Sequence, residues 1–178
     1  MTSTPNDLLL SRAAQIKLLV LDVDGVMTDG RLWFGDDGAE YKSFNVKDGH
    51  GIKQLISKGI DVAVISGRRS SAVDRRMKEL GITHYYAGQS NKLSAFSEVI
   101  EKLSVQPEQV AYMGDDQPDV AVMQLCGLPV AVADAHQCAI QVAGWVTTAN
   151  GGGGAVRELC DLILAQQPDL VAEDNANY

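Results

Sequence analysis

The chain has 178 residues, of which 46% are hydrophobic and 21% are charged, and its formal net charge is −8. This length and composition are typical of one globular domain with a real core. The acidic balance has no basic stripe to offset it, which argues against nucleic acid as a partner. No stretch has the length and apolar character of a membrane span, so no membrane partner is expected.

The three cysteines, Cys126, Cys138 and Cys160, are odd in number and show no pairing typical of metal ligands. This pattern favours buried, reduced thiols over a disulfide framework. The first residues lack the basic region and apolar stretch of a secretion signal. We therefore predict a cytoplasmic protein.

The first elements come in quick succession. Residues 8–14 form either a short helix capped by Asp7 or a frayed arm. The apolar run 18–21 ends in Asp22 and is typical of a strand that is buried on both faces of a parallel sheet.

Residues 31–44 are expected to form a β-hairpin, with strands at 32–34 and 40–44 around the turn sequence GDDG. The hairpin is rich in aromatic residues: Trp33, Phe34, Tyr41 and Phe44. These side chains either cover the core or form an interface with another subunit.

Further along, strands and helices alternate. A polar loop is predicted at 46–51 and a glycine-rich hinge at 150–154. Strands are predicted at 61–65, 83–86, 109–113, 129–133 and 145–147, and helices at 51–58, 71–80, 91–103, 119–125, 136–143 and 155–165. This alternation indicates a single α/β domain over 1–178, a three-layer sandwich with a mostly parallel central sheet. Residues 167–178 are predicted to be a mobile, acidic tail.

Polar residues follow several predicted strands at the point where each strand ends. Ligands of such sheets bind at the carboxyl ends of the strands. This rule brings together four separated patches, with Lys92 contributed by a helix start: Asp22 and Asp24; Ser66; Lys92; and Asp115, Asp116 and Asp119.

Phosphoryl transfer is the chemistry that these patches fit. Asp22 and Asp115 offer hard oxygen ligands of the kind that Mg²⁺ prefers. Ser66 and the amide of Gly67 can donate to phosphate oxygens, and Lys92 adds a fixed positive charge. Asp22 is then the candidate nucleophile. Asp24 is the candidate general acid, which later acts as the base for the attacking water.

These motifs resemble those of the haloacid dehalogenase (HAD) superfamily of phosphatases, in the family's order: DVDGV from Asp22, Ser66-Gly67-Arg68, Lys92, and GDDQPD from Gly114. The resemblance implies a Rossmann-like HAD fold and a Mg²⁺ held by the Asp22 carboxylate, the Asp24 carbonyl and the Asp115 carboxylate. It also implies that Asp116 supports the metal site and that Asp119 orients Lys92. Taken singly, Asp119 could instead be a helix N-cap and Lys92 a solvated cation.

The intervals between the motifs leave no room for a separate cap domain. A capless site is open to water and is commonly closed by another subunit, for which residues 31–44 offer a surface. More closely, the chain resembles the 3-deoxy-D-manno-octulosonate (KDO) 8-phosphate phosphatases, in the segments DVDGVMTDG, FNVKDGHG, ISGR and GGGGAVRE. That resemblance implies release of KDO for lipopolysaccharide synthesis by a homotetramer whose sites lie against neighbouring subunits.

A sugar acid phosphate carries a carboxylate, which guanidinium groups bind well, so Arg68 and Arg157 are the candidate substrate ligands. The glycine run 150–154 is expected to let the segment after it close over a site. Three alternatives stay open: a phosphatase of a nine-carbon sugar acid phosphate, a phospho-acceptor regulatory module that does not turn over, and an inert subunit.

Overall fold

The computed structural model describes residues 7–167. Its strands are β1 (Leu18–Leu21), β2 (Trp33–Phe34), β3 (Glu40–Tyr41), β4 (Asp61–Ser66), β5 (His84–Ala87), β6 (Val110–Gly114), β7 (Leu128–Ala131) and β8 (Trp145–Val146). Its helices are α1 (Asp7–Ala13), α2 (Val46–Ser57), α3 (Ser71–Leu80), α4 (Lys92–Leu103), α5 (Gln117–Met123), α6 (Gln137–Val142) and α7 (Ala155–Ala165), with a 3₁₀ turn at Pro107–Gln109.

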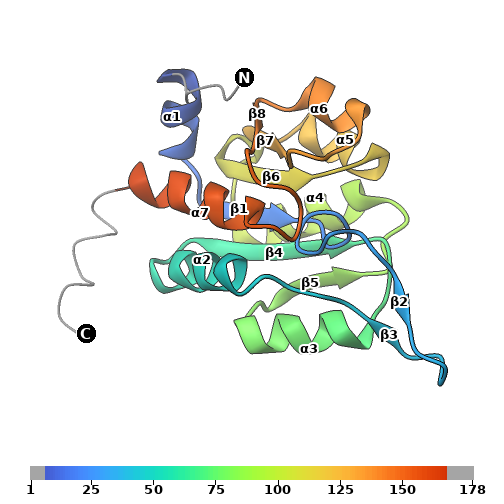
Figure 1. Ribbon diagram of the computed structural model, residues 1–178. Helices are drawn as coiled ribbons and strands as arrows, with labels where there is room; N and C mark the ends of the chain where they lie inside the picture. The colour runs from blue at the N-terminus through green and yellow to red at the C-terminus, as the bar shows by residue number, and fades with distance from the viewer. Residues whose placement is uncertain (1–6, 168–178) are drawn as a thin grey trace.

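Six parallel strands form the central sheet in the order β5-β4-β1-β6-β7-β8, and β2 and β3 form a separate antiparallel pair (Figure 1). Strand β1 lies inside the sheet, and all four of its side chains are buried. Side chains of successive strand residues point to opposite faces, which explains why β1 is apolar throughout. The predicted fold class is therefore confirmed.

Two layers of helices cover the sheet. Leu19 and Leu21 face a core cluster that includes residues of α1, α2, α3 and α7. Leu18 and Val20 face the opposite cluster, which includes residues of α4, α5 and α6. Burial of this apolar surface on both faces supplies the main driving force for folding.

Helix α2 begins at Val46, although the sequence predicts a polar loop at 46–51, so that prediction is wrong. The side chain of Asn45 caps the helix by accepting the amide of Lys47 at 2.8 Å. Gly51 faces α7, where an added Cβ would come within 2.9 Å of the Cys160 Cβ. Close packing of the two helices therefore outweighs the low helix propensity of glycine.

The hairpin leaves the sheet as a long arm (Figure 1). Its paired strands are shorter than predicted, and the turn closes through the Gly35 amide, which donates to the Ala39 carbonyl at 2.8 Å. Trp33, Phe34 and Tyr41 are 58%, 66% and 57% exposed, whereas Phe44 packs against the core. Of the two roles expected for the aromatic residues, Phe44 takes the first and the other three remain available for an interface.

The glycine run before α7 is packed against the loop after β1. The Gly152 amide donates to the Val26 carbonyl, and the Gly151 amide donates to Asp134 Oδ1, both at 2.9 Å. A Cβ on Gly151 would lie 1.7 Å from the Gly25 carbonyl oxygen. The expected hinge is therefore a close-packed contact, and its glycines allow two backbones to meet.

Several predicted boundaries shift by one to three residues. The first helix spans Asp7–Ala13, which excludes a frayed arm, and α5 begins at Gln117 because Asp116 serves as its N-cap. Residues 168–178 of the predicted tail lie outside the described part of the chain. None of the helices within residues 7–167 has the length and apolar character needed to cross a membrane.

Replacing Gly151 with alanine tests the close contact between Gly151 and the Gly25 carbonyl in the loop after β1. We expect Gly151→Ala to lower the free energy of unfolding by about 1–3 kcal/mol or more, because its Cβ would overlap backbone rather than a movable side chain. Urea unfolding followed by circular dichroism measures the effect. Gly144→Ala is the matched control, since its Cβ would meet its nearest atom at 3.5 Å. Equal stability of the two variants would contradict the assignment.

Candidate active site

The carboxyl ends of β1 and β6 bring two distant aspartates together. Asp22 follows β1, and its amide donates to the Met113 carbonyl in β6 at 3.1 Å. Asp115 follows β6 directly. Because β1 and β6 are parallel neighbours in register, the two carboxylates leave the sheet at the same edge. This is the edge at which the sequence places the site.

Lys92 is the cation at the centre of this edge. Its Nζ lies 2.6 Å from Asp22 Oδ1 and 2.6 Å from Asp119 Oδ1. Lys92 is only 5% exposed, so the alternative reading of a solvated cation is wrong. Burial by itself lowers the pKa of Lys92, but the carboxylates of Asp22 and Asp119 more than offset it and raise that pKa. The lysine is therefore held as a buried ammonium ion.

Asp119 is held in turn by four donors. Its Oδ1 accepts Lys92 and the hydroxyl of Tyr112 at 2.6 Å, and its Oδ2 accepts the amides of Asp115 and Asp116 at 3.0 and 3.2 Å. Because all four bonds converge on one carboxylate, Asp119 can hold Lys92 and the start of α5 in position. Sequence reasoning missed Tyr112, for which the one signal is a hydroxyl within the otherwise apolar strand VAYMG.

The remaining carboxylates suit a hard divalent ion. Oxygens of Asp22, Asp115 and Asp119 lie within 4.8 Å of one another. Burial is the main cause that raises the pKa of Asp22 to about 6 and that of Asp115 to about 8, and nearby carboxylates add to both effects. Since Asp119 is already saturated with donors, Asp22 and Asp115 are the pair that fits Mg²⁺.

The hairpin contributes a residue that sequence reasoning missed. Lys42 binds Asp24 Oδ1 through its ammonium group and lies 3.2 Å from Glu40 Oε1. Arg68 donates to Glu40 Oε2 at 2.6 Å, and its Nε is 4.0 Å from Asp24. Glu40 and Lys42 stand two residues apart beyond the aromatic strand, a spacing that points both side chains to one face. They tie the hairpin to the candidate acid–base residue.

The site contains a cavity of about 180 Å³. It is lined by Asp22, Asp24, Gly67, Arg68, Lys92, Asp115, Asp116, Pro118 and Asp119. Two predicted site residues are not in this lining. Ser66 is buried at the end of β4, where its hydroxyl accepts the Arg68 amide at 3.3 Å. Arg157 pairs with Asp161 at 2.7 Å along its own helix. Arg157 is thus no part of the cavity formed by its own chain.

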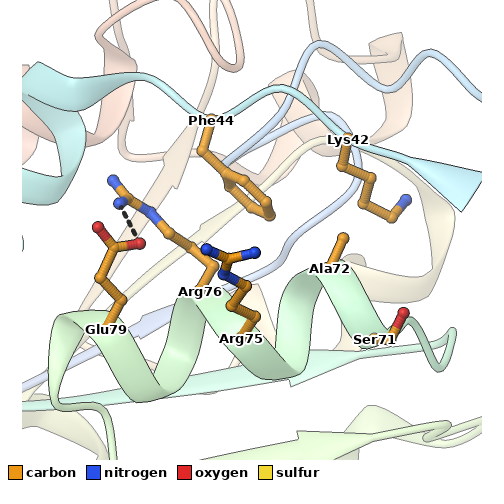
Figure 2. Close-up of a pocket in the computed structure, with 7 residues that line it drawn as sticks. All are labelled: Lys42, Phe44, Ser71, Ala72, Arg75, Arg76 and Glu79. Carbon is orange, nitrogen blue, oxygen red and sulfur yellow. Dashed lines mark hydrogen bonds and ion pairs between the residues drawn. The ribbon is translucent and has the colours of Figure 1, made fainter.

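A larger hollow of about 620 Å³ lies between α3 and the segment after β3. Figure 2 shows Lys42, Arg75 and Arg76 around it, with Phe44 between them. Arg76 is committed to structure, because it pairs with Glu79 at 3.0 Å and its guanidinium carbon lies 5.7 Å from the centre of the Phe44 ring. Three cationic side chains and the carboxylate of Glu79 line the hollow, which adjoins the site through Lys42.

The raised pKa of Asp115 predicts how pH affects the metal-free protein. The pKa of the Asp115 carboxyl is raised from its ordinary value of 3.8 to about 8 in the folded protein, so between these values the folded protein holds a proton that the unfolded chain has released. The free energy of unfolding therefore falls as pH rises from about 4 to about 8. Asp115→Asn removes the contribution of Asp115 to this slope, while that of Asp22 remains. We expect the free energy of unfolding of the variant, minus that of the native protein, to increase as pH rises from about 4 to about 8. Urea unfolding in the presence of EDTA measures this difference. The exposed-site control Asp61→Asn should show no such trend, and a constant difference for Asp115→Asn would contradict the prediction.

Comparisons with known proteins identify relatives of this chain. Residues 84–159 match the haloacid dehalogenase-like hydrolase family. The chain is 55% identical over 164 residues to 3-deoxy-D-manno-octulosonate 8-phosphate phosphatase KdsC of Yersinia pestis, covering 92% of this chain and 88% of that protein. It also matches the Moraxella catarrhalis 3-deoxy-D-manno-octulosonate 8-phosphate phosphatase, whose crystal structure contains magnesium, phosphate and KDO, with 42% identity, a TM-score of 0.88 and coverage of 92% and 94%.

A third similar structure is the cobalt-bound form of the deoxy-D-mannose-octulosonate 8-phosphate phosphatase of Haemophilus influenzae, with 41% identity, a TM-score of 0.86 and coverage of 93% of this chain and 96% of that one. Identity at this level over almost the whole length of each relative far exceeds what a shared fold alone requires. The chain belongs to the 3-deoxy-D-manno-octulosonate 8-phosphate phosphatases, a family of haloacid dehalogenase-like hydrolases.

Proposed function

We propose that the whole chain acts as one phosphatase domain that hydrolyses KDO 8-phosphate to KDO and phosphate with the help of Mg²⁺. The observation that carries the proposal is the buried triad of Asp22, Lys92 and Asp119, with Asp115 beside it at the strand ends. The substrates and ligands of the family relatives support it. The product places the enzyme in lipopolysaccharide precursor synthesis.

In the proposed mechanism, Asp22 attacks the phosphorus atom, and the bond from phosphorus to the sugar oxygen breaks. Asp24 protonates the departing oxygen, which leaves an aspartyl-phosphate on Asp22. Asp24 then takes a proton from water, which attacks the phosphorus and releases phosphate. Lys42, whose ammonium binds Asp24, keeps that carboxylate oriented between the two steps.

The equatorial phosphate oxygens need positive partners as charge develops on them. The Lys92 ammonium supplies one, and Ser66 and the Gly67 amide are the proposed neutral donors. The Asp22 and Asp115 carboxylates, with the Asp24 carbonyl, would hold the Mg²⁺, which lowers the repulsion between the anionic nucleophile and the phosphate. Asp116 supports this metal site in the proposal.

The sugar acid itself needs a partner for its carboxylate. Arg68 is the proposed ligand, because it lines the cavity beside Asp24 and its side chain is 47% exposed. The cavity of about 180 Å³ is smaller than typical small-molecule sites, so it suits the phosphate end of the substrate. The rest of the sugar would extend toward the open, hairpin side.

A panel of phosphate esters tests the substrate. We expect phosphate release to be fastest with KDO 8-phosphate, and Asp22→Asn to abolish it, since the amide keeps the shape but is no nucleophile. Malachite green assays of KDO 8-phosphate, a nine-carbon sugar acid phosphate and nucleotides provide the comparison. Asp61→Asn, on an exposed residue at the start of β4, is the matched control.

The same assay separates the competing functions. Activity should disappear with EDTA and return with Mg²⁺. Faster turnover of the nine-carbon substrate would reassign the substrate, and a single stoichiometric phosphorylation without turnover would indicate a regulatory module. Near-native activity of Asp22→Asn would rule out the covalent mechanism.

We also propose that the protein is a cytoplasmic homotetramer assembled through its hairpin. Trp33, Phe34 and Tyr41 are exposed on an arm that projects from the sheet (Figure 1). Exposed aromatic clusters of this kind are typical of interfaces, and the small, capless cavity supports closure by a neighbouring subunit. Three free thiols support a reducing compartment.

Substitutions on the hairpin test the assembly. We expect the double variant Trp33→Ser, Phe34→Ser to dissociate, because it removes the exposed aromatic surface while leaving the core intact. Light scattering after size exclusion should give four times the 19.1 kDa chain mass for the native protein and less for the variant. Leu125→Ser, which removes a comparably exposed apolar side chain elsewhere, is the control. An unchanged mass for the double variant would refute the role of the hairpin.

A further inference from the structure

A second group of side chains that could hold a metal ion lies beside the catalytic cavity, and two of its three members, His136 and Cys138, take no part in the proposed chemistry. It consists of Asp116, His136 and Cys138, whose ligand atoms all lie within 4.8 Å of one another. Asp116 caps α5, and His136 caps α6. The cysteines alone show no metal pattern in the sequence. The fold supplies the pattern by placing the start of α6 next to the end of β6, where the His136 amide donates to the Asp115 carbonyl at 2.7 Å.

The three ligand atoms lie near the separations that zinc requires, although none of the three distances matches them. His136 Nδ1 is 3.0 Å from Cys138 Sγ and 3.7 Å from Asp116 Oδ1, and Cys138 Sγ is 3.9 Å from Asp116 Oδ1. Tetrahedral Zn²⁺ with ordinary bond lengths separates such atoms by about 3.4–3.6 Å. Small side-chain rotations would therefore place all three around one ion, and the fourth position would face solvent.

A metal would replace one weak hydrogen bond of the group. His136 Nδ1 accepts the Cys138 amide at 3.3 Å, and because an imidazole nitrogen has a single lone pair, a bound ion would displace this long contact. Asp116 Oδ1 accepts the Gln117 amide at 2.7 Å, and a carboxylate oxygen can accept one donor and still bind a cation. The His136 and Asp116 side chains are 66% and 56% exposed, so an ion can reach them from solvent.

We infer that Asp116, His136 and Cys138 form a binding site for a thiophilic divalent cation such as Zn²⁺, distinct from the Mg²⁺ site. The donor set supports the distinction. Thiolate and imidazole are ligands that zinc prefers, whereas the Asp22 and Asp115 pair offers only hard oxygens. On binding, the Cys138 thiol forms a sulfur–zinc bond and its proton passes to solvent.

Cobalt spectroscopy of the full chain tests the site without relying on activity. With excess Mg²⁺ present and thiols kept reduced, Co²⁺ should give a sulfur-to-cobalt charge-transfer absorbance that Zn²⁺ abolishes. The Asp22 and Asp115 site has no sulfur and cannot give this band. Cys138→Ser should remove the band and raise the Zn²⁺ dissociation constant by at least about tenfold in calorimetry.

Two further variants complete the test. His136→Asn keeps a residue able to cap α6 but shortens the metal ligand, and it should also lose the band. His50→Ala, which removes an exposed histidine elsewhere, should keep it. Unchanged phosphatase activity of Cys138→Ser in Mg²⁺ would show that the fold is intact. Absence of the band in the native protein, or its persistence in Cys138→Ser, would overturn the inference.

Discussion

The buried ammonium of Lys92 is the contact on which this site depends. Asp22 reaches it from the end of β1 and Asp119 from the first turn of α5, and both are almost completely buried. Two carboxylates buried this close together would repel each other strongly without the cation, and removal of one partner of a buried ion pair is typically far more costly than the pair is worth. The lysine thus ties the starts of α4 and α5 to the end of β1.

Glycines allow the segments of this arrangement to approach one another closely. A Cβ on Gly25 would lie 2.1 Å from Asp115 Oδ2, and one on Gly114 would lie 2.4 Å from the Asp119 Cβ. The Gly151 contact with the Gly25 carbonyl supports the same loop from behind. The glycines of the site therefore allow carboxylates and backbone to approach where any larger residue would push them apart.

The edge of the site is less enclosed than its centre. The cavity around the carboxylates holds little more than a phosphate group, and the larger hollow by Lys42 and Arg75 lies next to it. The hollow is lined by the segment directly after β3, so it adjoins the hairpin that carries the exposed aromatic residues. On another side, Asp116 belongs both to the rim of the cavity and to the His136 and Cys138 cluster. The rim of the catalytic cavity is therefore surrounded by charged side chains and by the exposed aromatic side chains of the hairpin.

The sequence by itself determined the parallel α/β fold and the set of residues that meet at the strand ends. Buried strands and helix starts leave local signatures, and the edge of a parallel sheet collects whatever follows those strands. Only the tertiary structure decided that 46–51 is helical, that the glycine run is packed and that Arg157 lies outside its own chain's cavity. It also revealed Tyr112, Lys42 and the His136 and Cys138 pair. These features depend on contacts between elements far apart in the chain, and such contacts carry no local periodicity from which they could be predicted.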